Sequence, residues 1–318
     1  MKLYENCFRI YGSIPENNAY RSRWKNSVFS AFRFCIRLLS TKVVFPLCYK
    51  CKRKEKLNSQ DNLIVSLTSF PARLSTLWLT IESIKQQDLR PKKIILYLIE
   101  EEVSRDKVPM SLLAEEDELF EIRYRNIKMR AHGKYHYAMK DFPEDIIVTI
   151  DDDMIYPPYM LSTMMECYQK YPESVLTNQT TQIQLDEHGQ LQSYNNWKWL
   201  FDKDYYEIDG CIRKERLLPL GVCGVLYPPH LLYNDVLNFD LAKQLSYLAD
   251  DLWLYAMTNL SHHRVVKTSL NSLDIMPIDI KNNTTLFSIN GAENQNDKQF
   301  NQIRDYYKEK LGIDIVKP

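Results

Sequence analysis

The chain has 318 residues, of which 45% are hydrophobic and 26% are charged. That mixture is typical of a folded protein with a sizeable core and excludes a mainly disordered chain. The formal charge is zero, from 41 basic and 41 acidic residues, but its distribution is uneven. Residues 1–56 hold 13 Lys and Arg against 3 Asp and Glu, which leaves 28 against 38 in residues 57–318. A basic arm therefore precedes an acidic domain, and we expect the arm to meet an anionic surface.

The seven cysteines are odd in number and follow no framework spacing, which argues against a disulfide-stapled secreted fold and favours a reducing compartment. Cys48 and Cys51 form a CxxC pair, but no second pair and no nearby histidine completes a tetrahedral zinc site. We interpret this pair as two thiols beside a basic run.

Residues 28–49 of the arm form an apolar stretch that Arg33, Arg37 and Lys42 interrupt. An arginine at the centre of a spanning helix costs roughly 2.5–3.5 kcal/mol, so we do not expect this stretch to cross a membrane. On a helical wheel its polar side chains share one narrow stripe, and apolar side chains occupy the rest. The stripe consists of Asn26, Ser30, Arg33, Arg37, Ser40 and Thr41. We expect the helix to end near Lys42, before Pro46.

Basic residues flank this helix on both sides, within residues 20–56. The pattern predicts a helix in the interface of an anionic membrane, where each nearby cation contributes about 1 kcal/mol. The expected location is therefore cytoplasmic and peripheral, on the inner face of the cell membrane. A helix packed on the protein's own acidic domain is the alternative. Nucleic acid is not an expected partner, because the aromatic residues do not interleave with the cations.

From residue 57 the chain alternates short apolar strands with amphipathic helices. This pattern predicts a doubly wound mixed α/β sheet flanked by helices, in one domain covering residues 57–318. The expected strands cover residues 62–68, 93–99, 121–124, 145–150, 175–176, 183–185, 191–194 and 221–227. The expected helices cover residues 74–87, 133–142, 250–259 and 296–310.

Three acids, Asp151, Asp152 and Asp153, directly follow the apolar strand at residues 145–150. Ligands of open α/β sheets bind at the carboxyl ends of strands, where these side chains are delivered. Adjacent carboxylates repel one another unless a cation lies among them. A site made of oxygen ligands favours Mg²⁺ or Mn²⁺, and the phosphates of the substrate supply the remaining ligands of the ion. The sequence therefore predicts a metal–diphosphate site, with a solvated acidic loop as the alternative.

Residues 134–160, KYHYAMKDFPEDIIVTIDDDMIYPPYM, resemble the DxD region of GT-A fold glycosyltransferases, especially the family-2-like bacterial enzymes of capsule and lipopolysaccharide assembly. Three further segments agree in order. Residues 66–73, SLTSFPAR, resemble the first-strand nucleotide loop, and residues 221–229, GVCGVLYPP, the loop under the donor sugar. Residues 249–253, ADDLW, resemble the acidic motif that opens the catalytic helix.

The resemblance implies roles for single residues. Asp153 and Asp151 would ligate Mn²⁺ or Mg²⁺, and Asp251 or its neighbour Asp250 would be the general base. The implied nucleotide-sugar-binding residues are Thr68, Arg73, Lys134, Asp151, Asp152 and Gly224. Cys223 stands where a smaller residue is expected and would narrow the sugar pocket. No late histidine is placed to ligate the metal, so Asn290, Asn294, Asp297 or water would take that position.

The function that the resemblance implies is metal-dependent, inverting transfer of a sugar from a nucleotide sugar, a UDP-sugar, to a glycan or lipid-linked glycan in surface polysaccharide synthesis. One alternative is a catalytically silent, membrane-bound nucleotide- or glycan-binding protein. Another is a sugar nucleotidyltransferase, whose glycine-rich basic first loop is missing from residues 67–74. Trp197 and Trp199 are expected in the core or beside an acceptor, and His132 and His136 on the surface or in packing.

Overall fold

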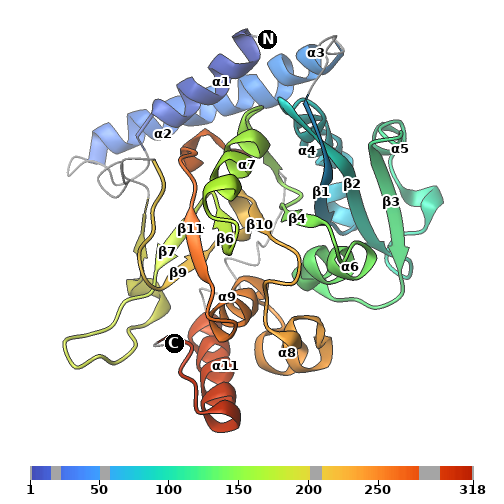
Figure 1. Ribbon diagram of the computed structural model, residues 1–318. Helices are drawn as coiled ribbons and strands as arrows, with labels where there is room; N and C mark the ends of the chain where they lie inside the picture. Colours follow the sequence, from blue (N-terminus) through green and yellow to red (C-terminus); the bar gives the residue numbers. More distant parts are fainter. Residues whose placement is uncertain (1, 16–22, 51–57, 201–209, 279–293, 317–318) are drawn as a thin grey trace.

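A seven-stranded mixed sheet forms the centre of the computed structural model, which describes residues 2–15, 23–50, 58–200, 210–278 and 294–316 (Figure 1). The strand order is β11-β6-β10-β4-β1-β2-β3, and β10 alone runs antiparallel to its neighbours within this described sheet. Its strands are β1 (Asn58–Thr68), β2 (Leu89–Ile99), β3 (Phe120–Arg125), β4 (Ile146–Thr149), β6 (Ser174–Thr177), β10 (Val225–Tyr227) and β11 (Arg264–Lys267). The predicted mixed α/β class is confirmed.

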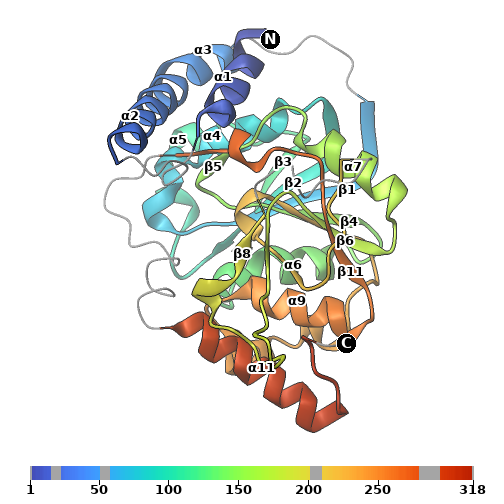
Figure 2. The same ribbon diagram turned by 90° about the vertical axis from the view of Figure 1, so that its left-hand side faces the viewer.

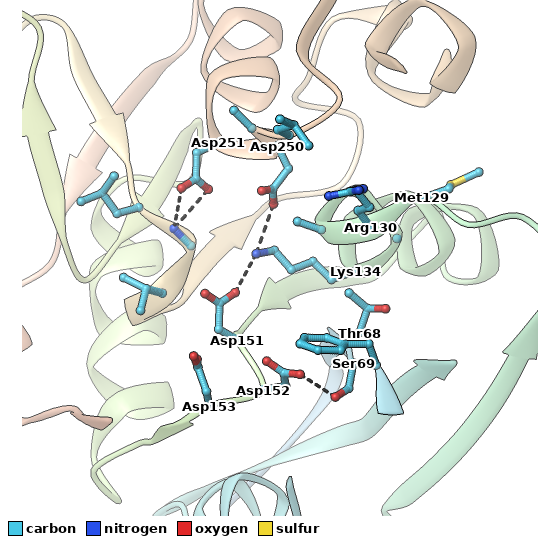
Figure 3. Close-up of a pocket in the computed structure, with 18 of the residues that line it drawn as sticks. Thr68, Ser69, Met129, Arg130, Lys134, Asp151, Asp152, Asp153, Asp250 and Asp251 are labelled. Atoms are coloured by element: carbon cyan, nitrogen blue, oxygen red, sulfur yellow. Dashed lines mark hydrogen bonds and ion pairs between the residues drawn. The ribbon is translucent and has the colours of Figure 1, made fainter. Parts of the chain in front are cut away.

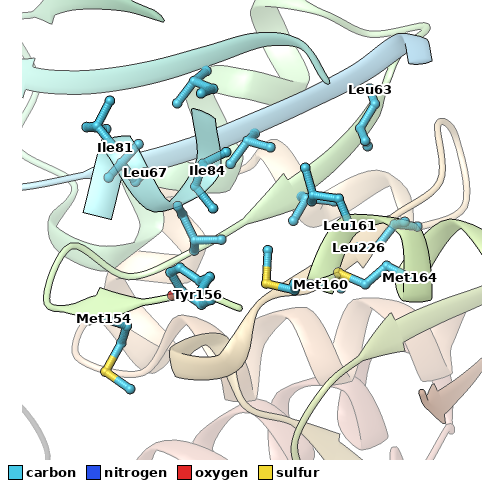
Figure 4. Packing of buried hydrophobic residues seen from close by; sticks show 14 of the residues in the cluster. Leu63, Leu67, Ile81, Ile84, Met154, Tyr156, Met160, Leu161, Met164 and Leu226 are labelled. Atoms are coloured by element: carbon cyan, nitrogen blue, oxygen red, sulfur yellow. The ribbon is translucent and has the colours of Figure 1, made fainter. Parts of the chain in front are cut away.

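Both faces of the sheet are covered, because the apolar residues of its central strands alternate between two layers. Leu63, Val65 and Leu67 of β1 face a core built with α4 (Leu74–Lys85) and α7 (Met160–Lys170). Figure 4 shows Met160, Leu161 and Met164 of α7 in this core, with Ile81 and Ile84 of α4. Burial on both faces explains why these strands read as continuous apolar runs.

The opposite face of β1 packs against α6 (Gly133–Asp141), where Ile64 meets Ala138. Beyond it a further core joins α8 (Phe239–Ser246), α9 (Asp250–Leu260) and α11 (Gln295–Leu311), with Trp253 and Phe300 fully buried. Figure 2 shows α6, α9 and α11 together on one side of the central sheet. A short helix, α5 (Met110–Leu113), precedes β3.

Two small sheets complete the described fold. One has the order β8-β7-β9, from β7 (Thr180–Gln182), β8 (Lys198–Trp199) and β9 (Leu217–Pro219). The other pairs β12 (Met276–Pro277) with β5 (Met154–Ile155). The strands expected at residues 183–185 and 191–194 are reduced to one bridge between Leu185 and Leu191. The strand expected at 221–227 begins with a 3₁₀ turn, Gly221–Cys223, and only its last three residues join the sheet.

The arm is helical over more of its length than expected. It contains α1 (Lys2–Ser13), which the sequence analysis did not anticipate, then α2 (Arg23–Leu39), a π-helical turn at Ser40–Val44 and α3 (Phe45–Lys50). The end of α2 at Leu39 is close to the helix end expected near Lys42, but the chain stays helical through Pro46 in the π turn and α3. Proline removes one helical hydrogen bond and crowds the preceding turn, and the wider π turn directly before α3 accommodates it.

Two of the arm's helices pack on the domain. Phe8 of α1 and Phe45 of α3 are fully buried in a cluster with Leu79 of α4 and Ile155 of β5. The predicted basic residues at 20–22 and 52–56, with Cys51 and Asn290, lie outside the described residues. Of the helices that the structure describes, none has the length and apolar character that crossing a membrane requires. The division at residue 56 stays a prediction.

Candidate active site

A pocket of about 740 Å³ opens at the carboxyl ends of β1 and β4 and beside the first turn of α9. Its size is that of a small-molecule site. Eight of the residues singled out from the sequence line it, and they come from four separate segments. They are Thr68, Arg73, Lys134, Asp151, Asp152, Asp153, Asp250 and Asp251. The fold therefore brings the dispersed motifs to one place.

Asp152 differs from its two neighbours because the protein itself holds its carboxylate. The residue is only 4% exposed, and its carboxylate accepts a hydrogen bond from Ser69 Oγ (Figure 3). It also accepts a hydrogen bond from the Arg73 guanidinium. Thr80 Oγ1 also donates to the main-chain oxygen of Asp152. Asp152 thus fixes the loop after β4, and its predicted contact with a nucleotide sugar stays a prediction.

Asp153 has a looser environment. Its Oδ2 lies 3.1 Å from Arg73 Nη2, so Arg73 stands between the carboxylates of Asp152 and Asp153. Burial, followed by the charge of Asp151, raises the pKa of Asp153 to about 7. A carboxylate that is this reluctant to ionise gains most from a further cation.

Lys134 of α6 connects the two acidic groups of the pocket. Its Nζ lies 2.8 Å from Asp151 Oδ1 and 3.1 Å from Asp250 Oδ2, as the dashed lines in Figure 3 mark. Burial works to lower the pKa of Lys134, but the charges of Asp151 and Asp250 outweigh it, so the pKa lies well above its usual value. Burial likewise works to raise the pKa of Asp250, yet Lys134 and then His132 hold it low.

Asp251 stands apart from the lysine and is held by the main chain. Both carboxylate oxygens accept from the Gly221 N–H, at 3.1 and 3.2 Å. Burial, and then the charge of Asp250, raises the pKa of Asp251 to about 8. The two neighbouring acids therefore differ. Asp250 is ionised and neutralised by a lysine, whereas Asp251 titrates near neutral pH, as a general base must.

Gly221 was not singled out from the sequence, but it has a clear steric role. A Cβ at this position would lie 2.9 Å from Lys134 Nζ and 3.0 Å from Asp251 Oδ1. Only a glycine lets its main chain approach both charged groups. The first glycine of the GVCG run carries this role, whereas the second, Gly224, was predicted to bind the nucleotide sugar.

The prediction for Gly224 needs a correction. Gly221 and Val222 line the pocket, but Gly224 is not among the lining residues. It has a φ of 92° and faces Met160, Asn178 and Ile150. Cys223 is buried in the core beside α7 and does not line the pocket either, so it does not narrow it. The 3₁₀ turn rotates both residues away from the site.

A divalent metal ion fits this donor set. Asp151, Asp152, Asp153, Asp250 and Asp251 are five carboxylates, and Arg73 and Lys134 are the two cations that contact them. With Glu102, Lys128 and Arg130, which also line the pocket, the charge is −2 when all of these groups are ionised. Such a site would repel a diphosphate unless a further cation were bound. Within the described ranges no three His, Cys, Asp or Glu side chains form a ready metal cluster. Mg²⁺ and Mn²⁺ accept one or two carboxylates when substrate phosphates supply the remaining ligands.

The two candidate metal ligands near the carboxyl end of the sequence that the structure describes do not lie in the pocket. Asp297 accepts from Ser193 Oγ at 2.8 Å and from the Tyr194 N–H at 2.7 Å, so its carboxylate caps a loop. Asn294 forms the left-handed residue before α11. Neither lines the pocket.

The two tryptophans divide between the two expected roles. Trp197 is buried and donates from Nε1 to Gln192 O. Trp199 is 41% exposed and lines the pocket together with Tyr194. Burial, and then the charge of Asp251, raises the pKa of Tyr194.

His132 and His136 pack in the interior, which is the second of the two roles expected for them. His132 is fully buried, accepts from Tyr135 OH and donates to Ser246 O, which ties the start of α6 to the chain just before α9. His136 lies against Phe239. Ser69 and Arg130 are among the pocket residues that the sequence analysis did not single out. Arg130 has a positive φ of 51°, for which an arginine gives no sequence signal.

No protein-family model and no curated protein matches the chain. Among solved structures, a 4-diphosphocytidyl-2C-methyl-D-erythritol synthase from Anaerococcus prevotii aligns over 72% of this chain and 97% of its own, at 13% identity and a TM-score of 0.41. A UDP-glucose pyrophosphorylase aligns over 80% of this chain and 100% of its own, at 10% identity and a TM-score of 0.39. A mannosyltransferase from Pyrobaculum calidifontis, in complex with GDP-Man and Mn²⁺, aligns over 46% of this chain, at 12% identity and a TM-score of 0.30.

This chain covers 45% of the mannosyltransferase. Likenesses this distant carry no argument about activity and leave the specific glycosyltransferase family unassigned. The activity has to be inferred from the residues of the site.

Proposed function

We propose that the protein is a metal-dependent, inverting glycosyltransferase that uses a nucleotide sugar, a UDP-sugar, and adds the sugar to a glycan or lipid-linked glycan of a surface polysaccharide. The observation that carries the proposal is the separation of two kinds of acid across one pocket. Asp251 lies on one side and Asp153 on the other, with Lys134 and Asp151 between them (Figure 3). Each kind of acid suits one half of a group transfer.

The first half is the departure of the nucleoside diphosphate. Asp153 and Asp151 would hold the metal ion, which supplies positive charge to the diphosphate when bound. Arg73 keeps Asp153 in place from the side of Asp152, and Lys134 does the same for Asp151. Thr68 and Phe70 line the end of the pocket at β1, where the nucleoside would lie.

The second half is the activation of the acceptor. A hydroxyl beside Asp251 gives its proton to that carboxylate, and its oxygen forms a bond to the anomeric carbon. The bond from that carbon to the diphosphate oxygen breaks, and its electron pair leaves with the diphosphate. Because a single carboxylate acts from the side opposite the leaving group, the anomeric configuration inverts. Trp199 and Tyr194 supply aromatic surface on which an acceptor sugar can rest.

Product analysis tests the proposal. A panel of UDP-sugars with Mn²⁺ is first screened for the one that most raises the thermal unfolding midpoint of the purified chain. The chain is then incubated with that UDP-sugar, Mn²⁺ and a lipid extract as the acceptor source. We expect UDP to be released in step with glycosylated lipid or glycan. A nucleotidyltransferase would instead form UTP and a sugar 1-phosphate when pyrophosphate is added. UDP-sugar binding without any product would identify a silent binding protein.

A further inference from the structure

The outer face of α2, α3 and the π turn between them exposes a row of large apolar side chains. Its members are Trp24 (67% exposed), Val28 (55%), Phe32 (53%), Phe34 (49%), Leu38 (39%), Leu39 (58%), Val43 (46%) and Leu47 (58%). We call these eight residues the apolar face. They recur about once per helical turn along residues 24–47, and Figure 2 shows α2 at the edge of the molecule, outside α1. An exposed apolar surface of this extent marks a binding region.

The polar side of the same helix turns inward, which is the reverse of an ordinary surface helix. Arg33 donates to Ile14 O at 2.8 Å and to Tyr11 O at 3.3 Å, and its guanidinium lies 4.1 Å from the centre of the Tyr11 ring. Ser40 and Thr41 are buried. These contacts with the end of α1 fix the rotation of α2, so its apolar face is directed away from the protein.

Positive charge accompanies the apolar face. Residues 23–50 hold six basic residues and no acidic one; the six are Arg23, Lys25, Arg33, Arg37, Lys42 and Lys50. Lys25 and Lys42 are exposed next to apolar-face residues. Two copies of this surface placed face to face would therefore bring like charges together. An anionic partner with an apolar interior satisfies both features at once.

We propose that the apolar face docks on an anionic phospholipid bilayer and lies in the plane of its headgroups. The apolar side chains enter the boundary of the acyl chains, while Lys25 and Lys42 contact anionic headgroups. The helix needs no rearrangement to do so, because its inward contacts with α1 are already made. This inference concerns a second surface of the molecule and does not depend on the chemistry of the pocket.

The docked surface connects to the pocket through α4. Arg73, which lines the pocket, directly precedes α4, and Leu79 of the same helix packs against α1 and α3. Six residues separate them, or about 9 Å along a helix axis. If the proposed function holds, a lipid-linked acceptor held in the bilayer would lie close to the enzyme that modifies it.

Vesicle sedimentation with the full chain tests the docking proposal. Vesicles of phosphatidylcholine alone are compared with vesicles that contain one part of phosphatidylglycerol to three of phosphatidylcholine. We expect binding to the anionic vesicles, at least tenfold weaker binding to the neutral ones, and a similar loss for Phe32→Glu. Met110→Glu is the matched control, because it adds the same charge at an exposed apolar residue on α5, and it should bind as the unmodified chain does.

The folded state of each variant is checked by its thermal unfolding midpoint, and Val28→Glu provides a second variant if Phe32→Glu is unstable. Equal binding by the unmodified chain and the folded variants would overturn the proposal. So would a concentration-dependent dimer that Phe32→Glu dissociates, because the occupant would then be a second copy. Vesicle binding needs no nucleotide sugar, so its failure is distinguishable from a failure of the proposed transfer.

Discussion

The pocket and the apolar face are opposite kinds of surface. The pocket gathers six carboxylates and four cations at the end of a buried sheet, where Lys134 is only 4% exposed. The apolar face directs Trp24, Phe32 and Leu39 into water. Both arrangements are unfavourable in an isolated chain, one because buried charge loses hydration and the other because apolar surface meets water. The difference teaches why the two proposed partners differ: we propose a cation with its diphosphate for the pocket and a lipid interface for the apolar face.

The two surfaces are built on different elements, so a substitution in one should not change the binding or activity of the other. The pocket residues follow β1 and β4 or begin α9, whereas the apolar face belongs to α2, α3 and the π turn between them. Substitutions in the pocket should change turnover and nucleotide binding without changing vesicle binding. A substitution in the apolar face should do the reverse. Loss of both properties from a single folded variant would break this separation.

The largest effect is expected for Asp251→Asn. The amide cannot accept the proton of the acceptor hydroxyl, so sugar transfer should fall by about 10³-fold, while UDP and vesicle binding remain. Rates of UDP-sugar consumption with acceptor measure this, and Asp305→Asn, an exposed acid on α11, is the control. Transfer within threefold of the unmodified rate would remove Asp251 from the reaction.

A smaller effect is expected for Gly221→Ala. The added methyl group would lie 2.9 Å from Lys134 Nζ and 3.0 Å from Asp251 Oδ1, so both groups have to move. We expect kcat to fall about tenfold, since small misplacements of reacting groups are costly. Gly133→Ala is the matched control at another lining residue, because its methyl group meets no atom closer than 3.5 Å. Equal rates for the two variants would show that the close approach at Gly221 has no catalytic role.

The smallest effect concerns stability and its dependence on pH. The pKa of Asp251 is raised to about 8 in the folded chain, from an ordinary value of 3.8. Folding therefore retains a proton that the unfolded chain releases, and the free energy of unfolding falls as pH rises from about 4 to about 8. Asp251→Asn has no carboxylate at this position, so its free energy of unfolding does not fall with pH for this reason. In EDTA and without nucleotide, its unfolding midpoint should exceed that of the unmodified chain by roughly 2–4 °C at pH 8, and by less at pH 5.

Calorimetric scans at the two pH values give these midpoints. A midpoint for Asp251→Asn that is lower than that of the unmodified chain at pH 8 would mean that this carboxylate is not held at a cost. In that case the pocket would not share with the apolar face the property of being unfavourable in an isolated chain.

Sequence periodicity predicted the central sheet because β1, β2 and β4 are buried on both faces and leave continuous apolar runs. The same runs end in Thr68 and Asp151, so the pocket's position at the strand ends was also predictable. The sequence predicted the separation of polar and apolar sides of α2 as well. It could not predict that the polar side turns inward, because this depends on α1, whose carbonyl oxygens bind Arg33.

The different roles of the individual pocket residues could not be predicted from the sequence either. Asp250 and Asp251 are adjacent, and their pKa values move apart because Lys134, at 3.1 Å from Asp250, and then His132 favour the ionised form of Asp250. Gly224 was selected over Gly221 because a 3₁₀ turn cannot be read from GVCG alone. The hydrogen bond from Ser69 to Asp152 joins residues that are 83 positions apart, so no local sequence pattern indicates it.

Calorimetric titration of UDP into the full chain, with and without Mn²⁺, tests the central claim most directly. The account predicts that UDP binds with Mn²⁺ and binds at least tenfold more weakly in EDTA. It also predicts that Asp153→Ala removes this dependence on the metal while the unfolding midpoint shows the variant to be folded. Mn²⁺-dependent UDP binding that survives unchanged in folded Asp153→Ala would contradict the account.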